Sequence, residues 1–356
     1  MTINLDLLSL YCGPGGLDLG FEQAGFRVAL ALDRNPDSVR TYNYNRSSRN
    51  PGQARVADIS SMSLADLDDL AGAELAPSGV IGGPPCQSFS QSNRSPKQED
   101  PRHELPMKFA ELLHELNQRQ PVPFFMFENV TYLTKPPHDG RFRDLFRALS
   151  DAGFSVMPAV LNAAHFGVPQ NRERLIVVGI NSSLYPGLKW QPPKPPADGE
   201  SGVISVKSAI GGFPEPVHYG RTLDKSEFPL HPNHWCMVPK SPKFSTEGAL
   251  KPGRTGPRSF KTLSWDLPSI TVAYGNREVH IHPGCKRRLS VFEAMTLQGF
   301  PDSYELLGSM SSQFSQVSEA VPPPLAKAVA QSILRRLQEY QGPPSRAGCS
   351  APTQRS

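Results

Sequence analysis

Cys86 is the residue that its sequence context marks most strongly as a nucleophile. It follows Gly83-Pro84-Pro85, directly after the short apolar run 79–82. The two prolines fix φ and remove two backbone donors, so the loop is rigid and presents the next side chain in one direction. A thiol presented in this way can act as a nucleophile if its pKa is lowered. A small buried hydrophobic residue is the alternative for a single cysteine, and the two prolines make us favour the nucleophile.

Acidic and basic side chains that could assist a nucleophile follow other apolar runs. Glu128 and Asn129 come after the run 124–127, and a partly desolvated carboxyl there can have a raised pKa and act as an acid. A helix cap is the alternative for this pair. Arg172 and Arg174 stand two residues apart, so on a strand both would point to one face and could bind a pyrimidine oxygen or a phosphate. A solvated charge cluster is the alternative for the arginines.

A glycine turn near the N-terminus could bind a ligand through its backbone. Gly13-Pro14-Gly15-Gly16 follows the apolar run 7–11, and Asp33 ends the next apolar run. Such a turn brings amides and a helix N-terminus to a ligand, and an acid after the next strand can accept ribose hydroxyls. The spacing differs from the GxGxxG of dinucleotide binders, which argues against a nicotinamide dehydrogenase. A turn whose glycines serve only the backbone stays open.

Short apolar runs that alternate with helical patterns over the first 180 residues must position these groups. Alternation of this kind predicts an α/β sheet. The spacing of Leu17 and Phe21, and of four apolar residues between Phe142 and Leu149, predicts two helices. The predicted strands are 7–11, 28–32, 79–82, 124–127 and 175–180, and the predicted late helices are 289–298 and 325–340.

The composition is typical of a soluble globular chain of one large and one smaller domain. The 356 residues are 38% hydrophobic and 20% charged. No run approaches the roughly 20 apolar residues of a membrane helix, and no secretory signal is visible at the N-terminus. Five cysteines without a CxxC pair exclude a disulfide scaffold and a zinc knuckle. We therefore expect a protein of the reducing cytoplasm, without a membrane segment or a metal.

An irregular basic segment interrupts the regular pattern. Residues 181–285 are rich in Pro, Gly, Lys and His and follow a stiff proline connector at 192–196. Residues 181–300 contain 15 Lys and Arg against 9 Asp and Glu, whereas the rest of the chain is mildly acidic. A basic insert in an acidic body is what a polyanion-binding segment would look like, with ordinary scatter of surface charge as the alternative. Residues 341–356 have the composition of a disordered tail.

Taken in order, these segments resemble the DNA cytosine-5 methyltransferases. The matching stretches span residues 7–180 and 285–334 and read LSLYCGPGGLDLGF, ADIS, GGPPCQSFS, ENV, FGVPQNRERLIVVG, RRLSVFEAMTLQGFPD and EAVPPPLAKAVA. The resemblance implies an α/β fold, with a Rossmann-like S-adenosylmethionine-dependent methyltransferase sheet domain and a smaller, irregular target-recognition domain. It places the catalytic, cofactor-binding domain at 1–180 plus 320–340 and the DNA-binding domain at 181–319.

The resemblance also assigns individual residues. Cys86 matches the nucleophile, Glu128 the acid at cytosine N3, Arg174 the contact to cytosine O2, and Arg172 a supporting position. Tyr11 matches the ring that packs on the adenine, Asp33 the ribose acceptor and Asp58 the acceptor of the adenine amino group. The implied cofactor-binding positions are Tyr11, Gly13, Gly15, Gly16, Leu17, Asp33, Arg34, Asp58, Ile59, Pro85 and Leu105. The implied DNA-binding positions are Gln87, Ser90, Arg287, Thr271 and Arg277.

The implied reaction overcomes the poor nucleophilicity of cytosine C5. Addition of the Cys86 thiolate at C6 makes the ring an enamine whose C5 can attack a methyl sulfonium. A neutral Glu128 at N3 and Arg174 at O2 stabilise the charge that develops. Loss of the C5 proton and release of Cys86 then restore aromaticity. The base must be flipped out of the duplex, at a cost of about a few kcal/mol, and phosphate and groove contacts from the basic insert would offset this cost.

One position departs from the family pattern. Ser318-Glu319 stands where the family usually has Gly-Asn before the VPP stretch. That asparagine helps to link the catalytic domain to the recognition region. Because every residue needed for bond-making is intact, our hypothesis is that Glu319 is tolerated.

The resemblance further implies cofactor and partners. S-adenosylmethionine is the expected cofactor, with S-adenosylhomocysteine as product, and double-stranded DNA is the expected partner of a monomeric bacterial modification enzyme. A restriction endonuclease for the same site is its expected companion. A tRNA cytosine-5 methyltransferase and a catalytically silent DNA-binding relative are the alternatives. Nine insert residues could touch bases: His231, Asn233, His234, Arg254, Arg258, Thr271, Asn276, Arg277 and His280. A phosphate contact or plain surface is an equal alternative for each.

Overall fold

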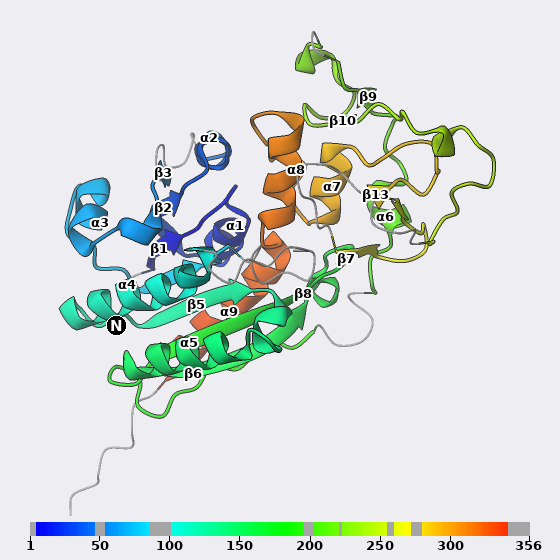
Figure 1. The fold of residues 1–356 in the computed structure, drawn as a ribbon. Helices are drawn as coiled ribbons and strands as arrows, with labels where there is room; N and C mark the ends of the chain where they lie inside the picture. The colour runs from blue at the N-terminus through cyan, green and yellow to red at the C-terminus, as the bar shows by residue number, and fades with distance from the viewer. Residues whose placement is uncertain are drawn as a thin grey trace, which may run out of the picture.

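A seven-stranded sheet forms the framework of the larger part of the protein (Figure 1). The computed structural model describes residues 5–46, 54–85, 101–195, 202–220, 223–254, 260–271 and 280–340. The strand order is β3-β2-β1-β4-β5-β8-β6, and only β8 runs antiparallel to its neighbours. The strands are β1 (Asp6–Leu10), β2 (Arg27–Asp33), β3 (Ala54–Val56), β4 (Gly79–Gly82), β5 (Phe124–Asn129), β6 (Phe154–Asn162) and β8 (Glu173–Asn181).

Helices cover both faces of this sheet. Side chains alternate between the faces of a strand, so Phe125 and Phe127 of β5 join one apolar cluster, whereas Phe124 and Met126 join another. Strands buried on both faces read as continuous apolar runs, which explains the composition of β4 and β5. The helices are α1 (Gly16–Gln23), α2 (Pro36–Tyr44), α3 (Leu64–Ala71), α4 (Leu105–Arg119), α5 (Asp139–Asp151) and α9 (Pro323–Gln338).

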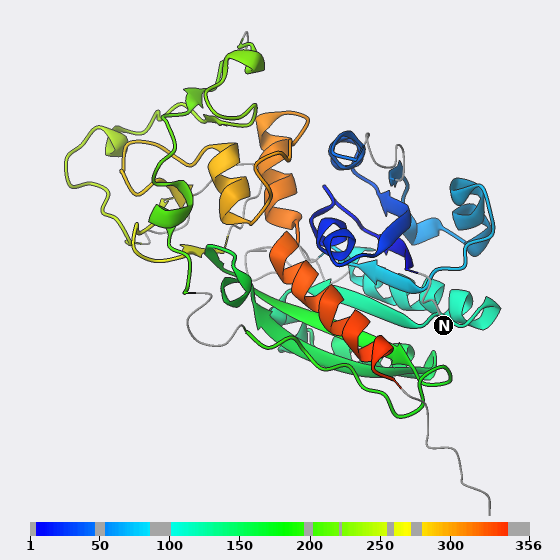
Figure 2. The same cartoon turned by 180° about the vertical axis from the view of Figure 1, so that it is seen from behind.

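The last helix returns to the beginning of the chain. Helix α9 lies across the face of the sheet opposite α4 and α5 (Figure 2) and packs against α1. The two helices approach so closely that a Cβ added to Gly20 would lie 2.4 Å from the Cβ of Ala326. The C-terminal part of the chain therefore completes the core of the sheet.

The smaller part contains little regular structure, as the sequence predicts. Its core gathers Trp235, Phe292, Phe300 and Phe314 with other apolar side chains. Buried polar bonds tie its loops together: the Asn233 side chain exchanges two hydrogen bonds of 2.9 Å with the backbone of residue 306. The elements outside the large sheet are α6 (Val206–Ile210), α7 (Val291–Leu297), α8 (Met310–Glu319), β7 (Gln170–Asn171), β9 (Val217–His218), β10 (Trp235–Cys236), β11 (Lys261–Thr262), β12 (Ser269–Ile270) and β13 (His280–Ile281).

The predicted strands and helices are confirmed with small shifts of their ends. The strand predicted to end at residue 127 continues to Asn129, because Glu128 and Asn129 still pair with β8. Strand β6 was not predicted, since Pro158 interrupts its pattern; as an edge strand it tolerates a residue without an N–H. Among the described residues, no helix is long and apolar enough to cross a membrane. The predicted tail 341–356 lies outside the described residues.

Candidate active site

The predicted site residues gather at one edge of the sheet. The parallel strands β1, β2, β4 and β5 end there, and open α/β sheets bind ligands at the carboxyl ends of their strands. Tyr11 follows β1, Asp33 ends β2, Pro85 comes shortly after β4, and Glu128 lies near the end of β5. Residues far apart in the sequence therefore reach one edge.

The glycine turn after β1 is fixed by backbone and carboxylate bonds. Gly13 and Gly15 have φ angles of 54° and 91°, in the left-handed region that glycine adopts readily. The Asp33 carboxylate accepts the N–H of Gly13 at 2.9 Å and that of Asn35 at 2.7 Å. Burial raises the pKa of Asp33, while these two amides oppose the shift. A Cβ added to Gly13 would meet no atom of the described residues within 4 Å, so that part of the structure leaves open space beside the turn.

Tyr11 and Asp58 provide an aromatic ring and a second carboxylate among the predicted cofactor residues. The hydroxyl of Tyr11 donates to the carbonyl of Leu105 at 3.2 Å, which ties the end of β1 to the start of α4. Burial, and after it the Asp58 carboxylate, raise the pKa of Tyr11. Asp58 is exposed, and hydrogen bonds from Ser60 lower the pKa of its carboxyl, so it is an anionic acceptor.

This set of groups fits S-adenosylmethionine. Two carboxylates can accept the ribose hydroxyls and the adenine amino group, Tyr11 can face the adenine, and the start of α1 can receive the methionine carboxylate. Ile59 and Leu17 are buried, whereas Arg34 is exposed next to Asp33. Among the described residues, no group of three or more His, Cys, Asp or Glu side chains could hold a metal ion.

Glu128 and Arg174 form a buried ion pair beside the segment that leads to Cys86. The Arg174 Nε atom lies 2.8 Å from a Glu128 carboxylate oxygen, and both side chains are about nine-tenths buried. A Cβ added to Gly83 would lie 2.9 Å from Glu128 Oε2, and Asn129 donates to the Pro84 carbonyl at 3.3 Å. The proline segment thus lies directly against the end of β5. Cys86 itself lies outside the described residues.

Burial favours the protonated form of Glu128. It raises the pKa of the Glu128 carboxyl above its usual value, although the charges of Arg174 and Arg172 oppose the shift. A carboxyl that holds its proton to higher pH can donate a hydrogen bond. The pair therefore combines an acid with a fixed cation.

Arg172 connects the sheet to the end of α8. Its guanidinium donates to the carbonyls of Ser318 at 2.7 Å and Ala320 at 3.1 Å. Gln298 also donates to the Ala320 carbonyl, at 2.6 Å, and accepts a bond of 2.9 Å from Gln170. The acceptors of these bonds at residues 318 and 320 are backbone carbonyls, which any side chain at position 319 leaves in place.

We expect Glu319→Asn to change kcat by less than about threefold. The reason is that Arg172 binds the backbone carbonyls of Ser318 and Ala320, and the Glu319 side chain is exposed. Methyl transfer under saturating conditions measures the effect, with wild type assayed in parallel. A rise in kcat of about 100-fold, equivalent to roughly 2.7 kcal/mol of barrier, would show that the carboxylate impairs the enzyme.

The predicted DNA-contacting residues have diverse surroundings. Gln87, Ser90 and Arg277 lie outside the described residues. The hydroxyl of Thr271 donates to the Asn171 carbonyl at 2.8 Å. The Arg287 guanidinium is buried and binds both oxygens of Glu293, each at 2.9 Å, and an oxygen of Glu215 at 2.6 Å. A DNA contact by Arg287 stays a prediction, and in this structure the residue holds the smaller part together.

Most of the histidine and asparagine residues that could contact bases according to the sequence are buried. His231, Asn233, His234 and His280 are all buried. The His234 ring lies between the Ser290 hydroxyl, at 3.0 Å, and the Pro214 carbonyl, at 2.8 Å. Arg258 and Asn276 lie outside the described residues, and Arg254 is exposed.

Several buried polar residues around the site were not singled out from the sequence. Arg46 and Tyr304 meet behind the glycine turn, and Gln170 and Gln298 meet beside Arg172. Both glutamines lie inside stretches that match the family, and this match was the only feature of the sequence that could have drawn attention to them. The partners in each pair are more than 120 residues apart, so no spacing along the chain indicates that they meet.

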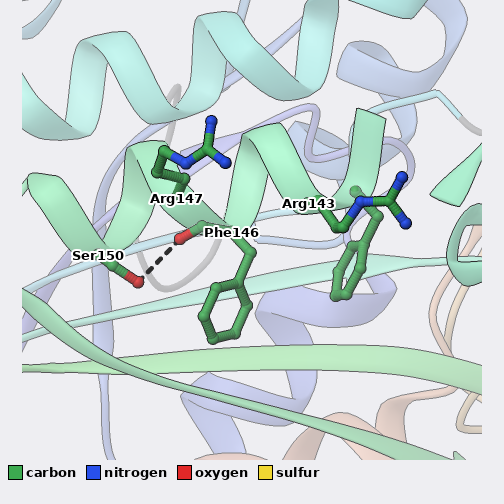
Figure 3. Close-up of a pocket in the computed structure, with 5 residues that line it drawn as sticks. Arg143, Phe146, Arg147 and Ser150 are labelled. Atoms are coloured by element: carbon green, nitrogen blue, oxygen red, sulfur yellow. Dashed lines mark hydrogen bonds between the residues drawn. The ribbon is translucent and has the colours of Figure 1, made fainter. Parts of the chain in front are cut away.

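A separate shallow hollow lies on the outer side of α5 (Figure 3). Its volume is about 430 Å³. It is lined by residues of this single helix: Phe142, Arg143, Phe146, Arg147 and Ser150. The Ser150 hydroxyl donates to the Phe146 carbonyl at 2.8 Å. No predicted site residue lines this hollow.

Solved structures with similar folds support the α/β methyltransferase assignment. A prophage-encoded protein of E. coli described as a DNA modification methyltransferase superposes with a TM-score of 0.76 at 23% identity, covering 94% of this chain and all of its own. The Dnmt2 methyltransferase of S. pombe superposes with a TM-score of 0.63 at 18% identity, covering 94% of this chain and 99% of its own. The predicted fold class is confirmed.

Comparisons of sequence identify the family. The chain is 30% identical to the type II methyltransferase M.MthTI of Methanothermobacter thermautotrophicus, over 94% of this chain and 99% of the relative. It is 31% identical to M.NmeDI of Neisseria meningitidis serogroup C, another type II methyltransferase, over 96% of this chain and 86% of the relative. The family model for C-5 cytosine-specific DNA methylases matches residues 5–335. The chain belongs to the C-5 cytosine-specific DNA methylase family.

Proposed function

We propose that this DNA (cytosine-5)-methyltransferase attacks C6 of a flipped cytosine with Cys86 while Glu128 donates to N3 and Arg174 binds O2. The observation that carries the proposal is the buried Glu128–Arg174 pair, 2.8 Å apart, against the rigid segment that leads to Cys86. Bound S-adenosylmethionine supplies an electrophilic methyl group. The chain supplies a nucleophile, an acid and a cation.

The proposed reaction consists of addition to C6, methyl transfer to C5 and elimination of Cys86. The Cys86 thiolate forms a bond to C6, and the C5–C6 π electrons move so that charge develops towards N3 and O2. Glu128 donates its proton at N3, and Arg174 stabilises the oxygen. C5 then forms a bond to the methyl carbon, the S–CH3 bond breaks with its electron pair left on sulfur, and S-adenosylhomocysteine is the leaving group. Loss of the C5 proton to a base and departure of the thiolate restore the double bond, and N3 returns its proton to Glu128.

The proposed cofactor residues lie beside this pair at the same edge of the sheet. Asp33 accepts the ribose hydroxyls, Asp58 the adenine amino group, and Tyr11 faces the adenine. The glycine turn 13–16 and Pro85 border the methionine part. Residues 1–180 with 320–340 form the proposed catalytic domain, a division that the packing of α9 on α1 supports. The proposed reaction uses no metal.

Duplex DNA is the proposed substrate of residues 181–319. The basic balance of this segment supplies phosphate contacts, which dominate affinity for DNA. M.MthTI and M.NmeDI are both named type II methyltransferases, so we propose a sequence-specific modification enzyme of the cytoplasm, acting as a monomer alongside a restriction endonuclease for the same site. The two Dnmt2 structures are only 18% and 17% identical to this chain, so their similarity concerns the fold and does not favour a tRNA substrate.

Trapping the Cys86 adduct tests the proposal. In a duplex made with 5-fluorocytosine in place of cytosine, methyl transfer leaves fluorine instead of a proton at C5, so the thiolate cannot be released. We expect wild type with S-adenosylmethionine to form a protein–DNA species that survives denaturing electrophoresis. Cys285→Ala, which removes a half-buried thiol elsewhere, should still form it, and Cys86→Ala should not. An adduct that persists in Cys86→Ala would refute the assignment of the nucleophile.

A further inference from the structure

A buried polar network packs against the glycine turn at Pro14 and Gly15. Arg46, just after α2, is its centre and is almost fully buried. Its Nε atom donates to both oxygens of Glu22 on α1, at 2.9 and 3.1 Å. Its guanidinium carbon lies 3.7 Å from the centre of the Tyr42 ring. A buried guanidinium with partners on several sides is costly to displace, so the position of the Arg46 guanidinium is fixed.

The network contacts two carbonyl groups of the turn. Arg46 Nη2 donates to the Gly15 carbonyl at 3.2 Å, and the Tyr304 hydroxyl donates to the Pro14 carbonyl. Arg46 Nη1 also donates to the Tyr304 hydroxyl at 3.2 Å. Tyr304 comes from the core of the smaller part, where it lies with Phe300. The turn is thus held jointly by α2 and by a segment some 290 residues further along the chain.

These bonds determine how the turn presents its amides. A trans peptide is planar, so its N–H points opposite to its C=O. Fixing the carbonyls of Pro14 and Gly15 therefore fixes the direction of the Gly15 N–H, which donates to the Cys12 carbonyl at 3.0 Å and closes the turn, and that of the Gly16 N–H. Since α1 begins at Gly16, the bonds also fix where the positive end of this helix points.

The packing leaves the turn little freedom to adjust. A Cβ added to Gly15 would lie 2.7 Å from Arg46 Nη1 and 2.8 Å from the Tyr42 ring. On the other side, a Cβ added to Gly16 would lie 2.4 Å from the Val321 carbonyl oxygen. The turn is therefore held between the network and the start of the last segment.

We propose that Arg46 and Tyr304 are positioning residues that hold the glycine turn in its cofactor-binding conformation, a role that rests on the proposed use of this turn for S-adenosylmethionine. In this role both side chains act through the carbonyls of Gly15 and Pro14 and not by direct contact with the cofactor. Because Tyr304 belongs to the core of the smaller part, docking of that part on α1 raises the affinity for the cofactor.

Binding of S-adenosylhomocysteine to the full-length protein, measured by calorimetry, tests this role. Tyr304→Phe removes only the hydroxyl, and we expect the Kd to rise about tenfold, or ~1.4 kcal/mol, the scale of one buried hydrogen bond. Arg46→Met removes every hydrogen bond of the guanidinium, including those to the Gly15 carbonyl and the Tyr304 hydroxyl, and we expect a rise in Kd of roughly 30-fold or more. For Tyr304→Phe, the KM for S-adenosylmethionine should rise while kcat at saturation stays within about threefold of wild type.

Two control variants separate positioning from general stability. Tyr340→Phe removes a hydroxyl that reaches the Pro186 carbonyl at 3.5 Å. Arg119→Met breaks an ion pair with Asp68 and a bond to the Leu75 carbonyl. Each control removes the same type of group away from the glycine turn and should leave the Kd within twofold of wild type, whatever its effect on the Tm.

The outcomes are distinguishable. If Tyr304→Phe and Arg46→Met lower the Tm but bind within twofold of wild type, the positioning role is overturned while the proposed function stands. If Arg46→Met does not fold, the Kd of Tyr304→Phe decides alone. If wild type itself does not bind S-adenosylhomocysteine, the proposed use of the turn fails, and this inference fails with it.

Discussion

Cys86→Ala is expected to abolish methyl transfer, with kcat lowered by at least about 10⁴-fold. Without a thiolate at C6, cytosine C5 stays too weak a nucleophile to take the methyl group. The remaining acid, cation and binding contacts cannot replace a covalent step. Transfer of labelled methyl groups from S-adenosylmethionine to DNA under single-turnover conditions measures the loss.

Binding should survive this substitution. Except for Pro85, the proposed cofactor residues lie on other segments, and Cys86→Ala keeps Pro85, so the Kd for S-adenosylhomocysteine should stay within about threefold of wild type, a difference of under ~1 kcal/mol. Cys285→Ala should retain full activity and serves as the matched control. Activity in Cys86→Ala within tenfold of wild type would exclude a covalent mechanism through this residue.

Glu128→Gln should lower kcat by about 10²–10³-fold, the usual effect of losing a positioned acid or charge-stabilising group. The amide still donates a hydrogen bond to N3 but cannot transfer a proton. Arg174 would also lose the carboxylate that now lies 2.8 Å away. Glu173→Gln makes the same chemical change at an exposed position of β8 and should leave kcat unchanged. A kcat of Glu128→Gln within threefold of wild type would remove Glu128 from the mechanism.

The pH dependence follows from the raised pKa of Glu128. The working form of Glu128 is protonated, so the alkaline limb of the kcat profile should fall as pH rises through that pKa, separately from any acid limb set by the Cys86 thiolate. Glu128→Gln should lack this alkaline decline, because its amide does not titrate. Arg174→Met should move the decline to higher pH, because the guanidinium lowers the Glu128 pKa. A decline that moves to lower pH in Arg174→Met would contradict the assignment.

The framework of the sheet could be predicted because its strands are continuous apolar runs with a clear turn residue at each end. The strand Gly79–Gly82 and the helix with Leu17 and Phe21 are confirmed. Strand β6 escaped prediction because Pro158 breaks its alternation, and an edge position tolerates this proline. The positions of Glu128 and Asn129 inside β5 depend on pairing with β8, which a local pattern does not reveal.

The local sequence context singles out Cys86, Glu128 and Arg174 as candidates, and the stretches that match the family add the role proposed for each. The supporting residues could not be predicted in this way. Arg46 and Tyr304 meet across 258 positions of the chain, and their types are also common on surfaces. In the smaller part, side-chain type alone was a poor guide to DNA contacts. His234 and Arg287 have side chains suited to DNA, but the fold buries both in hydrogen bonds of the smaller part.

The most direct test of the central claim is methyl transfer from labelled S-adenosylmethionine to unmethylated genomic DNA and, separately, to bulk tRNA. We predict label on DNA alone, as 5-methylcytosine within one short sequence when the product is sequenced after bisulfite treatment. Label on tRNA alone would contradict DNA as the substrate. Label on neither, with S-adenosylhomocysteine still bound, would contradict the proposed activity and identify a DNA-binding relative without catalysis.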